Sequence, residues 1–249
     1  MDEDLDALVR RVDEDRWLAS RFAPADARGR LIALYALNFE LAHVAEIVKA
    51  PAVGDIRLAW WREALGEIHA GKRARLHPVL SEYALAHKRT PFPLVWLEAL
   101  LDARGKDLDP APFDTLDDLD SYIDGTAGML MRLAAHTCGA DAEALDGFIA
   151  PAGRAWGLCG LIRAEPVWRA RGRRLLPRQG GTLDDLRRRA EAAYLEARAQ
   201  PKPAPAAAPA LNYVTLVPLY LSQLARERPS APLLMRQIKV VAATATGRL

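Results

Sequence analysis

The chain has 249 residues, of which 51% are hydrophobic and 27% are charged, and its formal net charge is +2. These values are typical of a folded globular protein, and they exclude wholesale disorder and a protein embedded in a membrane. The near-neutral charge gives no reason to expect a nucleic-acid partner. Ala, Leu, Arg and Glu dominate the sequence, and no alternating Val/Ile/Thr-rich segment stands out, so we expect an all-α protein.

The first residues and the cysteines indicate the compartment. The sequence begins MDEDLD, which has neither the apolar core of a signal peptide nor the Arg/Ser-rich character of a transit peptide. No apolar run approaches the roughly 20 residues that span a bilayer. Cys138 and Cys159 form no CxxC pair and no metal-spaced group, which fits reduced core residues. We therefore expect a cytoplasmic protein, with any membrane contact peripheral.

Two helices are expected in the first third of the chain. Apolar residues share one broad face from about Asp26 to Val48, and Pro51 and Gly54 end that helix. A second helix follows and stops at Gly71, because its apolar residues step by three and four. These residues are Leu58, Trp61, Leu65 and Ile68.

Further along, Thr115 and Asp118 resemble a capping box, which predicts a helix start. Gly125 and Gly128 then permit close packing or a bend. Pro151 indicates a new helix start or a kink, and the apolar pattern that follows is disturbed at Pro166.

A low-complexity run rich in Pro and Ala follows the helical body. Residues 200–209 read QPKPAPAAAP, a composition typical of extended or mobile chain. We therefore expect one helical domain over residues 1–199, a loop over 200–210, and a C-terminal helical segment over 211–249 packed on the same domain. About 40 residues make a doubtful domain by themselves.

The first motif lies in the expected helix near the N-terminus. Residues 35–46 read YALNFELAHVAE. They resemble a helix of the squalene/phytoene synthase superfamily that reads approximately Tyr-Ala-Phe-Cys-Arg-x-x-Asp-Asp-x-x-Asp in catalytic members. In this frame the first metal-binding aspartate is Ala42 and the middle acidic position is His43. The last is Glu46, which keeps a carboxylate.

The second motif supports the same resemblance. Residues 160–177 read GLIRAEPVWRARGRRLLP, similar to the family's Asn-x-Leu-Arg-Asp-x-x-x-Asp-x-x-Arg-Gly-Arg-x-x-Leu-Pro. The two aspartates are replaced by Ala164 and Trp168. The matching positions are Arg163, Arg171, Gly172, Arg173, Leu176 and Pro177. Residues 60–65, 77–78 and 115–128 also match, so the resemblance covers most of the chain from about residue 19 to 178.

The resemblance implies a single-domain helical bundle of the trans-isoprenyl diphosphate synthase type. In such a bundle, carboxylates one helical turn apart face each other in pairs and hold Mg²⁺ on a diphosphate. Ala42, Ala164 and Trp168 offer no oxygen ligand, so we expect no metal, no cofactor and no catalytic residue. We expect Ala42 and Trp168 to fill the vacated space as packed core. The histidines show no HxxxH or HExxH spacing, so no histidine metal site is predicted.

Several arginines are candidates for binding an anion or a diphosphate, through the forked contacts that arginine makes. They are Arg28, Arg30, Arg163, Arg171 and Arg173. The alternative interpretation is a solvated basic loop with ion pairs to the protein itself, and the sequence leaves both open.

Within the superfamily, residues 38–42, 161–166 and 217–221 resemble the branch that contains assembly factor 6 of mitochondrial respiratory complex I. This resemblance implies a non-catalytic protein that promotes assembly of NADH:quinone oxidoreductase. Its partner would be a complex I subunit or assembly intermediate, at the periphery of the inner membrane.

Two alternatives stay open at this point. An active prenyl-diphosphate condensing enzyme would need Mg²⁺ and relocated ligands such as Asp102, Asp107 or Glu165. An isoprenoid or lipid binding module would keep an apolar tunnel without the chemistry.

Overall fold

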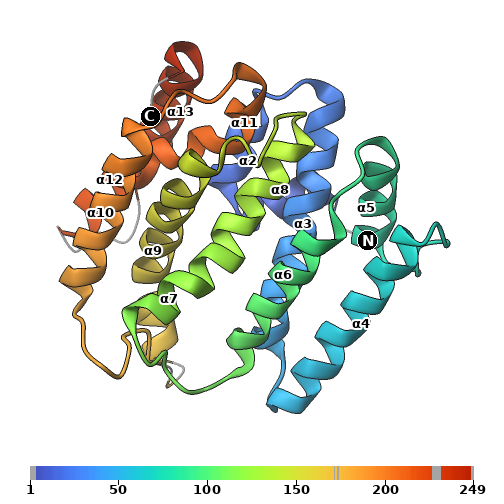
Figure 1. Cartoon of the computed structure of the whole chain (residues 1–249), viewed down its shortest axis with the longest axis horizontal. Helices are drawn as coiled ribbons and strands as arrows, with labels where there is room; N and C mark the ends of the chain where they lie inside the picture. Colours follow the sequence, from blue (N-terminus) through green and yellow to red (C-terminus); the bar gives the residue numbers. More distant parts are fainter. Residues whose placement is uncertain (1–3, 171, 173, 226–230, 248–249) are drawn as a thin grey trace.

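The computed structural model describes residues 4–170, 172, 174–225 and 231–247, and every regular element in these ranges is helical (Figure 1). The all-α prediction is therefore confirmed. The elements are α1 (Leu5–Val12), α2 (Glu14–Ser20), α3 (Ala25–Ile47), α4 (Pro51–His69), α5 (Pro78–Arg89), α6 (Leu94–Gly105), η1 (Lys106–Leu108), α7 (Leu116–Ile123), η2 (Asp124–Gly128), α8 (Met129–Thr137), α9 (Asp146–Ala170), α10 (Leu183–Ala199), η3 (Pro205–Ala207), α11 (Ala208–Leu211), η4 (Asn212–Leu216), α12 (Val217–Leu224) and α13 (Leu233–Thr246).

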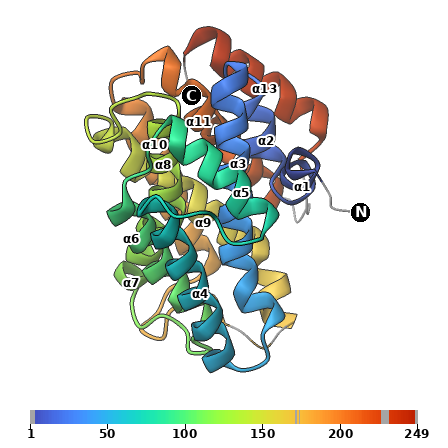
Figure 2. The ribbon, with the colours of Figure 1, turned by 90° about the vertical axis from the view of Figure 1, so that its right-hand side faces the viewer.

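Across the bundle the helices follow one another from α10 at one side through α9, α7 and α6 to α4 at the other (Figure 1). α13 lies beside α2 across one end of the bundle (Figure 2). Among the described residues, no helix has both the length and the apolarity needed to cross a bilayer.

α3 is the central helix of the fold. It begins at Ala25 and ends at Ile47, each one residue from the predicted bounds, and it contacts α1, α4, α5 and α8. Apolar side chains are buried around most of its circumference in the first half, as expected for a helix surrounded by others. Val48 is extended and Pro51 begins α4, so the chain turns sharply between the two helices.

α9 continues through both of its prolines. Pro151 and Pro166 were expected to start or disturb a helix, but both lie inside one element from Asp146 to Ala170. Proline lacks the N–H that would bond the carbonyl four residues earlier, so each costs the helix one hydrogen bond. The contacts of α9 with α10, α12, α7 and η2 compensate for these losses.

Glycines let α9 approach α7 and η2 closely, and at Gly153 the contact is backbone to backbone. A Cβ on Gly153 would lie 2.6 Å from Cα of Gly128, and one on Gly157 would lie 2.3 Å from Cγ2 of Ile123. η2 is a short π-helical turn containing Gly125 and Gly128. The predicted close packing or bend at these two glycines is thus confirmed.

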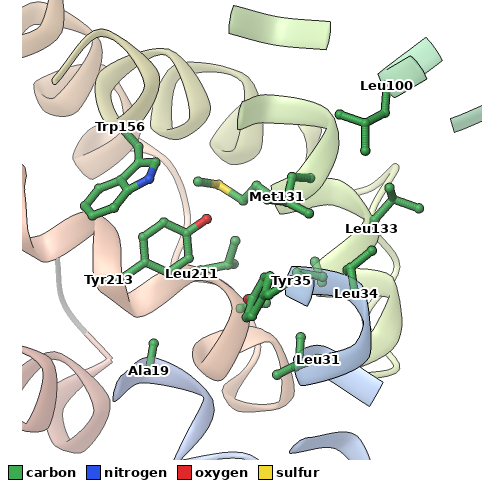
Figure 3. Packing of buried hydrophobic residues seen from close by; sticks show 14 of the residues in the cluster. Ala19, Leu31, Leu34, Tyr35, Leu100, Met131, Leu133, Trp156, Leu211 and Tyr213 are labelled. Atoms are coloured by element: carbon green, nitrogen blue, oxygen red, sulfur yellow. The ribbon is translucent and has the colours of Figure 1, made fainter. Parts of the chain in front are cut away.

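Apolar and aromatic side chains fill the centre of the bundle (Figure 3). Tyr35 of α3, Trp156 of α9 and Tyr213 of η4 meet there, and the Trp156 and Tyr213 ring centroids are 4.7 Å apart. The Tyr35 hydroxyl is buried there without a hydrogen-bond partner. The core therefore joins segments from the start, the middle and the end of the sequence.

The Pro/Ala-rich run is folded in its second half, which corrects the expectation of an extended or mobile segment. Residues 201–204 are without regular structure, but Pro205 begins η3, and α11 follows directly. Ala207 of η3 and Ala210 of α11 are fully buried, and α11 packs against α2 and α8. Small side chains here allow that close packing.

Both cysteines lie in the interior, Cys159 fully buried and Cys138 partly so, and both are free thiols. Burial raises the pKa of each thiol to about 12, so neither is a reactive thiolate at neutral pH. This agrees with their interpretation as reduced core residues.

A histidine cluster joins α4 to α5. His69 Nε2 lies 2.9 Å from the Tyr83 hydroxyl, and the rings of His69 and His87 are 4.0 Å apart. Burial, together with the neighbouring His87, lowers the pKa of His69 to about 4. Burial also lowers the pKa of His87, whose Nδ1 accepts a hydrogen bond from the backbone N–H of Phe92.

We expect Gly153→Ala to lower the free energy of unfolding by about 1–3 kcal/mol, because the new methyl group forces α9 away from η2. Gly160→Ala, in the same helix, is the matched control. Its Cβ meets no atom within 4 Å, so it should raise stability by up to about 1 kcal/mol. Urea denaturation measures both. Equal effects would contradict the close backbone contact.

We expect the protein to lose stability as pH falls from about 6.5 towards 4, partly through His69. In this window the unfolded chain protonates His69 at its ordinary pKa, while the folded chain does not, so protons favour unfolding. His69→Gln should lose less in melting temperature than the wild type between pH 7 and pH 5. Carboxylates titrate in both proteins and cancel in the comparison. Parallel pH profiles would contradict this role for His69.

Candidate functional site

The four degenerate motif positions line one cavity. Ala42 and Glu46 of α3 and Ala164 and Trp168 of α9 border a cavity of about 660 Å³, together with residues from the α3–α4 turn, α6, η1 and α7. We call this cavity the outer cleft. The structure thus brings together the positions that the sequence motifs identified.

The outer cleft is open, which corrects the expectation that Ala42 and Trp168 would form packed core. Ala42 and Ala164 are small and partly exposed, so they leave space where longer side chains would reach inward. Trp168 lies one turn beyond Ala164 and also borders a neighbouring cavity of about 480 Å³. Its ring therefore separates two cavities rather than filling one.

Glu46 and Asp107 are the two carboxylates among the residues lining the outer cleft. Glu46 Oε2 is 2.9 Å from His43 Nδ1 on the same helix. Asp107 is bonded to Arg104 and Tyr122. Two carboxylates with such partners do not provide the octahedral oxygen set that Mg²⁺ requires.

The other acidic residues considered for a relocated metal site lie in ion pairs of their own. Asp102 bonds Arg62 at 2.6 Å, and Glu165 lies 3.7 Å from Arg169. In the part of the chain that the structure describes, no three His, Cys, Asp or Glu side chains are grouped so as to hold a metal ion. The residues present therefore do not fit the metal cluster that the family motifs describe.

Arg104 organises the inner end of the outer cleft. Its Nη1 donates to Asp107 at 3.1 Å and its Nη2 donates to Asn38 Oδ1 at 3.0 Å, while the Tyr122 hydroxyl donates to Asp107 at 2.6 Å. Burial opposes the charge on Arg104, but Tyr122 and Asp107 outweigh it and raise the pKa of the guanidinium. The network ties α3, α6, η1 and α7 together.

Of the predicted anion-binding arginines, Arg28, Arg30 and Arg163 do not line the outer cleft. Arg28 donates to the backbone carbonyls of Arg21 and Ala23, each at 3.1 Å, and Arg30 bonds Asp26 at 2.9 Å. Arg163 lies over the Tyr220 ring, with its guanidinium carbon 3.8 Å from the centroid.

The remaining members of the predicted set, Arg171 and Arg173, lie outside the described residues. Anion binding by the whole set of five stays a prediction. Two neighbours in the basic run, Arg174 and Arg178, do border the cavity beyond Trp168.

Arg16 and Arg104 were not predicted as site residues from the sequence motifs. Both lie on buried helix faces, where an arginine interrupts an apolar pattern. Arg104 follows Leu97 and Leu101 at helical spacing in α6, and Arg16 precedes Ala19 in α2. An arginine at a core position is the signal that would have identified each of them.

Comparisons with known proteins agree with the motifs. A sequence model described as squalene/phytoene synthase matches residues 9–182. The chain is 29% identical over 170 residues to a Bos taurus protein named NADH dehydrogenase (ubiquinone) complex I, assembly factor 6, covering 68% of this chain and 51% of that protein. The Mus musculus protein of the same name is 28% identical over 187 residues, covering 73% and 56%. The chain thus spans about half the length of these curated relatives.

Solved structures share the fold. A dehydrosqualene synthase in complex with ligand superposes with a TM-score of 0.79 at 16% identity, covering 97% of this chain and 94% of that one. Squalene synthase HpnC from Alicyclobacillus acidocaldarius gives 0.71 at 20% identity, covering 98% and 92%. At these identities the likeness shows the fold, which is the terpenoid synthase type that the motifs implied.

We expect Tyr122→Phe to lower the free energy of unfolding by about 1.5–3 kcal/mol, because a hydrogen bond to a buried carboxylate is lost. Tyr194→Phe is the matched control, since Tyr194 is also buried but its hydroxyl lies outside this network. It should change stability by less than about 0.5 kcal/mol. Urea denaturation at pH 7 checks both, and equal losses would show that the Asp107 network does not hold the cleft.

Proposed function

Since the chain belongs to the squalene/phytoene synthase family, we propose that it keeps the family's fold but acts as an assembly factor for respiratory complex I, without condensing prenyl diphosphates. Its partner in this proposal is a complex I subunit or assembly intermediate. The protein works at the cytoplasmic face of the membrane that contains the complex, and contacts that membrane peripherally.

The composition of the outer cleft is the observation that carries the proposal. Ala42, Ala164 and Trp168 stand where the family motifs have metal-binding aspartates, and Asp107 is held by Arg104 and Tyr122. A metal stabilises a departing diphosphate by several kcal/mol, and each 1.36 kcal/mol is a tenfold change in rate. Loss of these ligands therefore removes many orders of magnitude from a metal-dependent condensation.

The relatives support the assembly half of the proposal. Matching proteins from mammals are named complex I assembly factors, and a Drosophila melanogaster protein named as a homologue of assembly factor 6 is 25% identical over 166 residues. The match to the family model, residues 9–182, includes both degenerate motifs.

Deletion of the gene in its own organism should lower the amount of assembled complex I several-fold and leave the isoprenoid profile unchanged. Native gels stained for NADH dehydrogenase activity measure the first, and mass spectrometry of lipid extracts measures the second. Re-expression of the wild-type chain is the control. Normal complex I in the deletion strain would contradict the assembly role.

The purified chain supplies the second readout of the same experiment. With farnesyl or geranylgeranyl diphosphate and Mg²⁺, it should release no more diphosphate than a blank without protein. Clear turnover would contradict the loss of catalysis and favour the condensing enzyme instead.

A further inference from the structure

The helix α13 packs on the bundle with one side and leaves an apolar side exposed. It contacts η4 and α2, and its buried residues are Val240 and Ala243 (Figure 2). The residues on the opposite side of the helix follow helical spacing, and all of them are exposed and apolar. We call this surface the end face. It consists of Leu234, Met235, Ile238, Val241, Ala242 and Ala245.

The end face is more apolar than an ordinary surface helix. Leu234 is 66% exposed and Ile238 is 54% exposed. Single exposed apolar residues are common on proteins, but a continuous stripe of them on one helix marks a surface that contacts another molecule. α10, at one side of the bundle, shows the usual pattern. Its exposed positions include Asp184, Arg188 and Glu191.

A pocket of about 570 Å³ continues the end face at the C-terminal end of α13. Ala245 belongs to both surfaces. The rest of the pocket is lined mainly by apolar side chains from the α2–α3 turn, α9 and the Pro/Ala-rich run, among them Phe22, Phe148 and Pro205. The exposed apolar surface at this end of the bundle is therefore larger than one helix face.

The charges around this surface are positive. α13 and the described residues that line the pocket include Arg236, Lys239 and Lys202 but no acidic residue, although 32 of the 249 residues are acidic. Arg236 is paired with two carboxylates of α2. Lys202 donates to a backbone carbonyl rather than to a carboxylate, and Lys239 is partly exposed at the edge of the end face. The two lysines therefore make this end of the bundle complementary to an anionic surface.

The size of the end face favours a lipid surface over a protein partner. A helix of 14 residues is about 21 Å long, and a face about 10 Å wide on it offers about 200 Å² in projection. Each partner in a stable protein interface buries about 800 Å². A bilayer needs no matching surface, because an apolar helix face with cations at its edge lies among the headgroups and the upper acyl chains.

We propose that the end face of α13 lies in the surface of a bilayer that contains anionic lipids. Leu234 and Ile238 enter the acyl region, while Lys202 and Lys239 stay at the level of the headgroups. Apolar burial and electrostatic attraction together provide the two contributions that stable but reversible membrane binding requires. The proposal rests on the proposed function only in naming the surface through which that peripheral contact is made.

Flotation with lipid vesicles tests the proposal on the purified wild-type chain. The chain should float with vesicles of phosphatidylcholine mixed with phosphatidylglycerol and bind pure phosphatidylcholine about tenfold more weakly, because two lysines face the headgroups. Raising the ionic strength should weaken the binding to the mixed vesicles. No flotation with the mixed vesicles, or equal binding to both kinds, overturns the proposal.

A pair of variants locates the contact. Leu234→Gln combined with Ile238→Gln should weaken binding to the mixed vesicles at least about tenfold, because two apolar side chains no longer enter the acyl region. The matched control combines Ile56→Gln of α4 with Leu85→Gln of α5, which are 71% and 60% exposed and lie outside the end face. The control should bind like the wild type. Equal losses in both variants, or no loss in the α13 variant, overturn the proposal.

A fluorescent label reports on the end face with Leu234 and Ile238 in place. Ala242→Cys accepts a thiol-reactive dye that is sensitive to polarity, whereas burial raises the pKa of both native thiols to about 12 and slows their reaction. The emission of the dye should shift to the blue when mixed vesicles are added. The same dye on Ile56→Cys should not respond. Unchanged emission from the Ala242→Cys protein that has floated with the vesicles overturns the proposal.

Two further measurements separate this proposal from its alternatives. A wild-type dimer that becomes monomeric in the α13 variant, without vesicle binding, identifies a second copy on the end face and overturns the membrane contact. No flotation together with low complex I in the deletion strain rejects the membrane contact and leaves the assembly role. Flotation through α13 together with normal complex I in that strain supports the membrane contact and rejects the assembly role.

Discussion

The ion pair between Arg104 and Asp107 ties together the helices around the cleft between α3 and α9. A buried guanidinium is stable only when paired and hydrogen-bonded, and Arg104 obtains this from Asp107, Tyr122 and Asn38. Asp107, one of the two carboxylates that line the outer cleft, is therefore engaged in this ion pair. The bonds of Arg104 and Asp107 connect α3, α6, η1 and α7. The cleft thus has a paired arginine among the residues that line it, together with the positions that carry metal-binding aspartates in the family motifs.

The fold itself does not depend on those metals. α9 is held by the glycines that face η2 and by its long contact with α10. α3 is packed against α1, α2, α4, α5, α6 and α8. Ala42 and Ala164 favour helix at least as well as the aspartates they replace. This explains how the chain superposes on a dehydrosqualene synthase with a TM-score of 0.79 at only 16% identity. The packing was kept while the ligands were lost.

Local signals in the sequence predicted much of this architecture. The bounds of α3, the capping box at Thr115 and the close packing at Gly125 and Gly128 all follow from short-range rules. The motifs also placed Ala42, Glu46, Ala164 and Trp168 around one cleft. Tertiary contacts decided the rest: they keep α9 helical through two prolines and fold the second half of the Pro/Ala-rich run.

The polar interior was not predictable by the same rules. Arg16 and Arg104 have charged side chains on faces that are otherwise apolar, and their partners Asp13, Asp107 and Asn38 are known only once the helices are placed. Likewise, a small side chain in place of an aspartate does not reveal whether the space is filled. Here it is open.

Electron paramagnetic resonance of Mn²⁺ tests most directly whether the outer cleft, with its Arg104–Asp107 ion pair, still binds a divalent metal ion. Mn²⁺ takes the same oxygen ligands as Mg²⁺, and its free-ion signal falls when it binds. With an unreactive farnesyl thiodiphosphate present, adding the protein should leave the free Mn²⁺ signal equal to that of the analogue alone. Stoichiometric further loss of that signal on adding protein would contradict the account.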